Sequence, residues 1–204
     1  MDQVAARVES SGVDRDTALA CARLSLGDAE QAMELAGEKG RELRAGAERF
    51  ARSALSGEAS RISPWSDVMA AVRARGDATR AQLEAQATEE LELYPRKERK
   101  RIETEWNERI RRVRRRVETA ALDLALQVVS LWYADLACLA WGAEELVRNS
   151  DRMQELRADE GIDPARLRAA IELVEDTRVR FVLNVSEELA CEALAYRLER
   201  LLAL

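Results

Sequence analysis

The chain has 204 residues, which is enough to bury a sizeable core, and we expect one large domain or one domain with a small appendage. Aromatic residues make up 4% of it and charged residues 34%, with Ala, Leu, Glu and Arg dominant, so the composition predicts an all-α protein. The net charge of −6 argues against a protein that coats nucleic acid over its whole surface.

The N-terminal residues carry no basic flank followed by an apolar run, so we expect a cytoplasmic protein. The most apolar window runs from Ala120 to Trp141 and is interrupted by Asp123, Gln127 and Asp135. An acidic residue costs roughly 3 kcal/mol at the centre of a bilayer. The window therefore predicts a buried core helix and no contact with a membrane.

Three cysteines, Cys21, Cys138 and Cys191, stand far apart in a chain that has no histidine. Their odd number and isolation predict neither a disulfide framework nor a zinc site. We expect buried thiols in a reducing compartment.

Residues 1–36 predict three short helices. Ser11-Gly12 ends the first, Asp14 is placed to cap the second, and Gly27-Asp28 opens the third. This unit is too small to fold readily alone, so we expect a piece of something larger and place a boundary near Gly37. Residues 37–204 form the second predicted unit.

The second unit begins with a helical stripe that follows Gly40. Its apolar positions are Leu43, Ala47, Phe50, Ala51, Ala54 and Leu55. Ser63-Pro64 then signals a new helix, because Ser63 can cap free amides and Pro64 fits the first helical position. We expect that helix to end near Gly76.

A long apolar stripe starts at Ile102 and continues in steps of three and four, which predicts one helix reaching Trp141. At 1.5 Å per residue this helix spans about 60 Å, roughly twice the width of a small domain. Its first half must project or pair. A weaker stripe precedes it, and Tyr94-Pro95 is a natural corner. Residues 77–118 therefore predict a projecting antiparallel helical arm.

Two further helices close the chain, one starting at Asp163-Pro164 and the other after Ser186. The positions expected to face the core are Leu167, Ala170, Ile171, Val174, Val179 and Val182 in the first, and Leu189, Leu194, Leu198 and Leu201 in the second.

Catalytic motifs are missing from the sequence. Without histidine there is no Ser-His-Asp or Cys-His arrangement and no His-ligated metal site. Neither glycine-rich phosphate-binding pattern occurs. Adjacent acidic pairs such as Glu144-Glu145 diverge on a helix and do not act together. We therefore expect no enzyme activity, cofactor or metal in this chain.

A basic run from Arg96 to Arg116 is the most prominent feature outside the apolar stripes. Its candidate contact residues are Arg109, Arg111, Arg112, Arg114, Arg115 and Arg116. The simplest interpretation is a solvated arm, because Glu105 and Arg109, like Glu108 and Arg112, are i to i+4 pairs in the favourable order. An acidic protein partner and the phosphates of DNA are the alternatives.

Three tryptophans, Trp106, Trp132 and Trp141, lie near the long stripe. We interpret them as core or interface anchors, because a platform for stacking bases needs exposed rings in a basic groove. Trp132 and Trp141 are accordingly candidate partner contacts.

Three stretches share a pattern with a known family: Trp132-Tyr133-Ala134-Asp135-Leu136, Gly142 to Asp151, and Asn184 to Leu194. They resemble the C-terminal region of the delta-prime subunits of the bacterial DNA polymerase III clamp loader. The resemblance implies that residues 1–36 are the end of a helical lid. It implies that the rest is a helical collar joining five subunits into the ring that supports sliding-clamp loading. It also implies collar domains of other subunits as partners, an isolated fragment that is monomeric, and only indirect or weak contact with DNA.

The lid of the family's ATP-hydrolysing subunits carries a Gly-Ser-x-Arg-Asp-Ala signature. Here the corresponding stretch is Gly27 to Ala32, with Glu30 at the arginine position. A carboxylate there repels phosphate, which favours the subunit that resembles an ATPase without acting as one. Other departures are Ala134 in place of a basic residue and Ser150 in place of a proline.

The arm from Asp77 to Glu118 exceeds the usual collar, so the resemblance implies no role for it. The alternatives to a delta-prime collar are the collar of the ATP-hydrolysing subunit and a free helical module whose basic arm binds DNA.

Overall fold

The computed structural model describes residues 1–181 and 186–203. Helices make up 84% of it, and no described residue lies in a strand, so the predicted all-α class is confirmed. The elements are α1 (Asp2–Glu9), α2 (Arg15–Leu24), α3 (Ala29–Ala36), α4 (Glu38–Leu55), α5 (Ala59–Ile62), α6 (Trp65–Glu92), α7 (Arg96–Ala140), the 3-10 turns η1 (Glu144–Leu146) and η2 (Ser150–Arg152), α8 (Met153–Ala158), α9 (Pro164–Arg180) and α10 (Glu187–Leu202).

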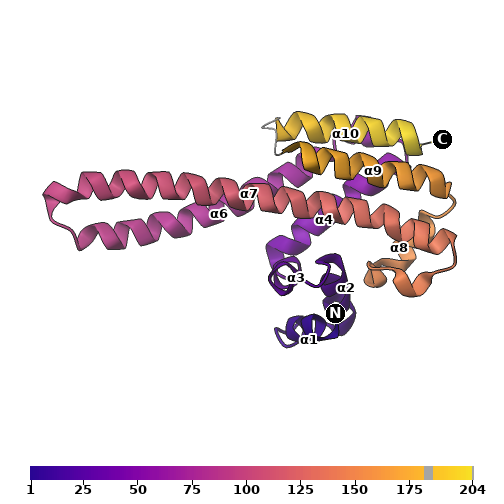
Figure 1. The fold of residues 1–204 in the computed structure, drawn as a ribbon, viewed down its shortest axis with the longest axis horizontal. Helices are drawn as coiled ribbons and strands as arrows, with labels where there is room; N and C mark the ends of the chain where they lie inside the picture. The colour runs from indigo at the N-terminus through magenta and orange to yellow at the C-terminus, as the bar shows by residue number, and fades with distance from the viewer. Residues whose placement is uncertain (182–185, 204) are drawn as a thin grey trace.

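Helix α7 organises the molecule. It has 45 residues and runs without interruption along the length of the protein, as its apolar stripe predicts. Its second half packs against α4 and α9, while its first half pairs with α6 in an antiparallel hairpin that extends away from the body (Figure 1). In the same view α9 and α10 lie on one side of α7, and α1 to α3 lie on the other.

Two apolar clusters hold these elements together. The larger joins all of the body, from Val8 and Leu35 to Trp132 and Leu198. The smaller lies in the hairpin and consists of Ala87, Ile102, Trp106 and Ile110, with Leu83, Leu91 and Tyr94 packed against it. The division near Gly37 stays a prediction, and side chains on both sides of it belong to the larger cluster.

Several helix starts have the caps that the sequence indicates. The side chain of Asp14 accepts a hydrogen bond from the amide of Thr17 at 3.0 Å, and Asp28 accepts from the amides of Glu30 and Gln31. Ser186 accepts from the amide of Leu189 at 3.5 Å. Ser63 was expected to cap α6 and does not, since it has a φ of 51° and α6 has no side-chain cap.

Gly76 does not end its helix, contrary to expectation, because α6 continues to Glu92. The glycine is buried where the two helices of the hairpin approach each other. A Cβ at this position would lie 2.3 Å from Oε1 of Glu118 on α7. Gly76 therefore permits close helix packing, and its sequence signal was misread as a stop.

Two apolar positions near the C-terminal end are exposed although they were expected to face the core. Val179 is 69% and Leu189 65% exposed. The buried face of α9 instead follows Leu167, Ala170, Val174 and Thr177, and a residue two positions beyond Thr177 points away from it. Val182, Asn184 and Val185, which entered the sequence predictions, lie outside the described residues.

One helix, α7, is long and apolar enough to cross a membrane by length and composition. Within its apolar window, 67% of the residues are buried inside the protein, as in the core helix of a soluble protein.

Candidate functional site

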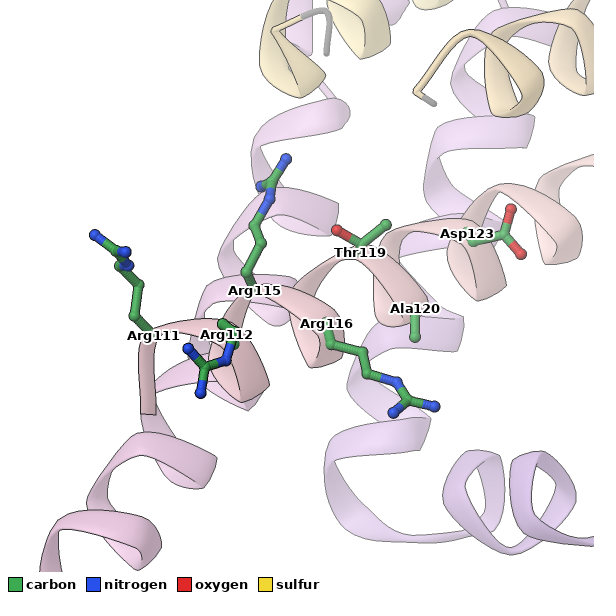
Figure 2. Close-up of a pocket in the computed structure, with 7 residues that line it drawn as sticks. All are labelled: Arg111, Arg112, Arg115, Arg116, Thr119, Ala120 and Asp123. Carbon is green, nitrogen blue, oxygen red and sulfur yellow. The ribbon is translucent and has the colours of Figure 1, made fainter. Parts of the chain in front are cut away.

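The predicted arginines of the arm, except Arg114, are exposed on α7. Four of them, Arg111, Arg112, Arg115 and Arg116, line a shallow open concavity of about 800 Å³ together with Thr119, Ala120 and Asp123 (Figure 2). Every lining residue comes from α7. Thr119 and Ala120 contribute short side chains to it, and we call the four arginines, which have long side chains, its rim.

Acidic neighbours neutralise some of these arginines. Arg115 Nη2 lies 2.9 Å from Oε1 of Glu187 at the start of α10. Arg112 Nη1 lies 3.4 Å from Oε2 of Glu108, which is one of the two helical pairs that the sequence predicts. Among the residues that the structure describes, Arg111 and Arg116 form no ion pair.

The other predicted pair is wrong. Glu105 contacts Arg101 at 2.6 Å instead of Arg109. Arg109 stacks over the ring of Trp106, with its guanidinium carbon 4.6 Å from the ring centroid, and the indole N–H of Trp106 donates to Oε2 of Glu90 at 3.1 Å. Trp106 is thus a buried anchor that joins the two helices of the arm.

Arg114 points to the opposite side of the arm from the concavity. It lies 3.0 Å from Oδ1 of Asp77 on α6, and its Nε donates to Oε1 of Glu118 at 2.9 Å. This arginine joins α6 to α7 beside Gly76. It is separate from the four arginines of the rim.

The two other tryptophans have opposite surroundings. Trp132 is completely buried, and its indole N–H donates to Oδ2 of Asp159 at 3.2 Å. Trp141 follows the last turn of α7 and is 72% exposed. Trp132 is therefore a core residue and cannot contact a partner directly, whereas Trp141 is not part of the core.

Asp135, the acidic residue of the Trp132–Leu136 stretch, binds α7 to the turn that follows Val147. Its carboxylate is fully buried and accepts hydrogen bonds from the amides of Arg148 at 2.9 Å and Asn149 at 2.8 Å. The side-chain amide of Asn149 donates to it as well, at 2.8 Å. Burial raises the pKa of Asp135 above its ordinary value, and these hydrogen bonds oppose the rise.

Arg44 on α4 extends this buried network, and the sequence analysis missed it. It donates to Oδ1 of Asn149 at 3.0 Å and makes two hydrogen bonds to the carboxylate of Asp151, at 2.8 and 2.7 Å. Burial tends to lower the pKa of Arg44, but the hydrogen bonds and charge of Asp151 outweigh it and leave the pKa raised. Nε of Arg44 also lies 2.8 Å from Glu48, in a charge contact whose angles do not suit a hydrogen bond. In the sequence, the one indication of this buried role is that Arg44 directly follows Leu43, the first residue of an apolar helical stripe.

The cysteines are poor nucleophiles in this fold. Burial raises the pKa of Cys191 to about 12, and it also raises the pKa values of Cys21 and Cys138. Within residues 1–181 and 186–203, no cluster of three or more His, Cys, Asp and Glu side chains is arranged to hold a metal ion. The chemistry that the described side chains offer on the surface is electrostatic attraction of anions by the arm, together with apolar contact near Trp141.

No family model, curated protein or solved structure matches this chain.

Proposed function

We propose that this chain is an assembly region of the clamp-loader delta-prime type, in which a helical collar holds unlike subunits together. The observation that carries the proposal is the exposure of Trp141. Burying a tryptophan removes a large apolar surface from water, and tryptophan is enriched at the energetic centres of protein interfaces.

The surroundings of Trp141 support a docking role. Leu146 follows it five residues later in the η1 turn and is 59% exposed. The backbone between them is tied to the end of α7, because the amide of Ala143 donates to the carbonyl of Cys138 at 2.9 Å, and the η1 turn is closed by a bond from the amide of Val147 to the carbonyl of Glu144 at 3.1 Å. A partner would thus meet apolar side chains on an ordered turn, which reduces the entropy lost on binding.

The start of α3 supports the delta-prime type over the ATP-hydrolysing type. Glu30 lies exposed in the first turn of α3, and Asp28 already caps the free amides there. Two carboxylates at this helix start repel phosphate and occupy the donors that an anion would need. The proposed role is therefore structural, and the interaction partner is the collar of the ATP-hydrolysing subunit.

A pull-down tests the proposal. We expect the chain to be monomeric or weakly self-associating alone and to co-purify with the collar of the ATP-hydrolysing subunit. Replacing Trp141 and Leu146 by Ala should weaken that complex roughly 10-fold or more. The matched control replaces Ile62 and Leu93, which are 43% and 83% exposed elsewhere, and should leave it unchanged. Failure of the pull-down together with a tight homodimer in light scattering would refute the proposal.

A further inference from the structure

The solvent side of the arm carries more positive charge than its surroundings neutralise. Residues 96–118 contain eleven basic and five acidic side chains, a net charge of +6 in a chain whose total is −6. Arg112 and Arg115 are 68% and 58% exposed despite their acidic neighbours. Arg111 and Arg116 have no ionic partner in the described part of the chain. Unneutralised charge of one sign repels itself, so this face favours the approach of an anion.

The arrangement of the arginines indicates an extended anion. Figure 2 shows that the side chains of Arg111, Arg115 and Arg116 leave α7 in different directions and do not converge on one point. A compact ligand such as a single phosphate would need converging donors from several elements, and all residues of the concavity come from one helix. A ligand whose charges are spread along its length can reach each guanidinium separately.

Among its described residues, this face has no large apolar side chain that could act as an anchor. None of the large apolar side chains exposed in the described residues lies between Arg96 and Ala140. A stable protein partner usually needs an apolar or aromatic anchor at the centre of its interface. A phosphate backbone needs none, because its binding is driven by release of counterions. Trp106, the aromatic residue nearest the arginines, is buried beneath Arg109 and offers no ring on which unpaired bases could stack.

We propose that the solvent face of the arm binds the phosphate backbone of duplex nucleic acid, with Arg111, Arg112, Arg115 and Arg116 as the contact residues. The hairpin extends away from the body (Figure 1), and of these four arginines Arg115 lies beside the start of α10 through its contact with Glu187. The binding is independent of base sequence, because guanidinium groups on phosphates read no base edges. This inference does not depend on the proposed assembly role, and the pull-down with the collar can fail while it holds.

Fluorescence anisotropy with a labelled DNA duplex at several salt concentrations tests the proposal. The variant R111Q/R116Q removes the two unpaired arginines. The control R61Q/R168Q removes the same charge from exposed arginines of α5 and α9, which are 71% and 82% exposed. We expect the slope of log K against log salt to fall by about 1.8 in the arm variant only. Between about 50 and about 200 mM salt, the unmodified chain should lose affinity about 12-fold more than that variant.

Three outcomes would overturn the inference. One is no saturable binding of the duplex at about 50 mM salt. Another is an equal fall of the salt slope in both double variants, which would mean that the net charge of the protein, and not this face, governs binding. The third is tighter binding of poly-glutamate than of the duplex, lost in R111Q/R116Q, which would assign the face to an acidic protein. Unchanged circular dichroism and melting temperature in both variants verify that folding is intact.

Discussion

At the scale of single residues, Arg44 is the cation around which the buried acids of the body are arranged. It joins α4 to the turn that follows α7 through Asn149 and Asp151. The same turn is fixed to α7 by Asp135. Charges from three distant parts of the chain thus lock one surface turn, the turn that follows Trp141 and Leu146. Asp135, Asn149 and Asp151 therefore act together as a structural lock.

Replacing Arg44 by Met should destabilise the fold by about 3 to 5 kcal/mol. The side chain of Asp151 is only 6% exposed and would remain buried, with Arg152 as its one remaining cation among the residues that the structure describes. Urea unfolding followed by circular dichroism measures the loss. The control is Arg49→Gln on the same helix, where the side chain is 57% exposed, with an expected change within about 0.5 kcal/mol. A loss below about 1 kcal/mol for Arg44→Met would mean that Asp151 does not need this cation.

At the scale of elements, glycines decide how closely helices approach. Gly40 lies near the start of α4 against the end of α3. A Cβ there would stand 1.9 Å from the carbonyl oxygen of Glu34 and 2.6 Å from Cα of Leu35. Both atoms belong to backbone, which cannot move aside as a flexible side chain can. Gly46 lies six residues later, and a Cβ there would meet Val68 at an ordinary 3.6 Å.

These two glycines of one helix should respond oppositely to the same substitution. Gly40→Ala should lower the free energy of unfolding by about 1 to 3 kcal/mol, because the added methyl group forces α3 and α4 apart. Gly46→Ala should raise it by about 0.5 to 1 kcal/mol, because alanine has the higher helix propensity and fits the space. Thermal and urea unfolding of the two variants provide the measurement. Stabilisation by Gly40→Ala would show that α3 and α4 leave room for a methyl group at this position.

The helices are predictable from the sequence to the extent that local chemistry defines them. The apolar stripe from Ile102 to Leu131 requires one continuous helix. Asp14 fixes the start of α2 by accepting a hydrogen bond from the first turn of that helix. Gly76 could not be interpreted in this way, because its role depends on Glu118, which lies 42 positions away in sequence. Arg44 was missed for the same reason, since its hydrogen-bond partners Asn149 and Asp151 lie beyond residue 148.

At the scale of the whole molecule, body and arm have separate apolar clusters. The arm depends on four buried residues, whereas the body cluster draws on helices from α1 to α10, including parts of α6 and α7. Regions with few buried apolar contacts open locally at lower cost than the core. The two parts should consequently differ in the free energy of local opening.

Native-state hydrogen exchange should reveal this difference. We expect amides of the helical residues of the arm, 81–92 and 96–110, to exchange faster than those of residues 121–137 in the body, which are also helical. Mass spectrometry of peptides from the two segments gives the comparison. Trp106→Ala should accelerate exchange in the arm and leave the body unchanged, because Trp106 belongs to the smaller cluster. Equal protection of both segments would mean that the molecule opens as a single cooperative unit.

Helix α7 belongs to both the body and the arm, and it therefore couples them mechanically. A helix of 45 residues is a stiff rod of about 68 Å. It passes from the tip of the arm to the residues that hold the turn after Trp141. Gly76 on α6 leaves room for the side chain of Glu118 on α7 where the two helices pair. A load applied to the arginines of the arm is thereby transmitted along one covalent element to the opposite end of the protein.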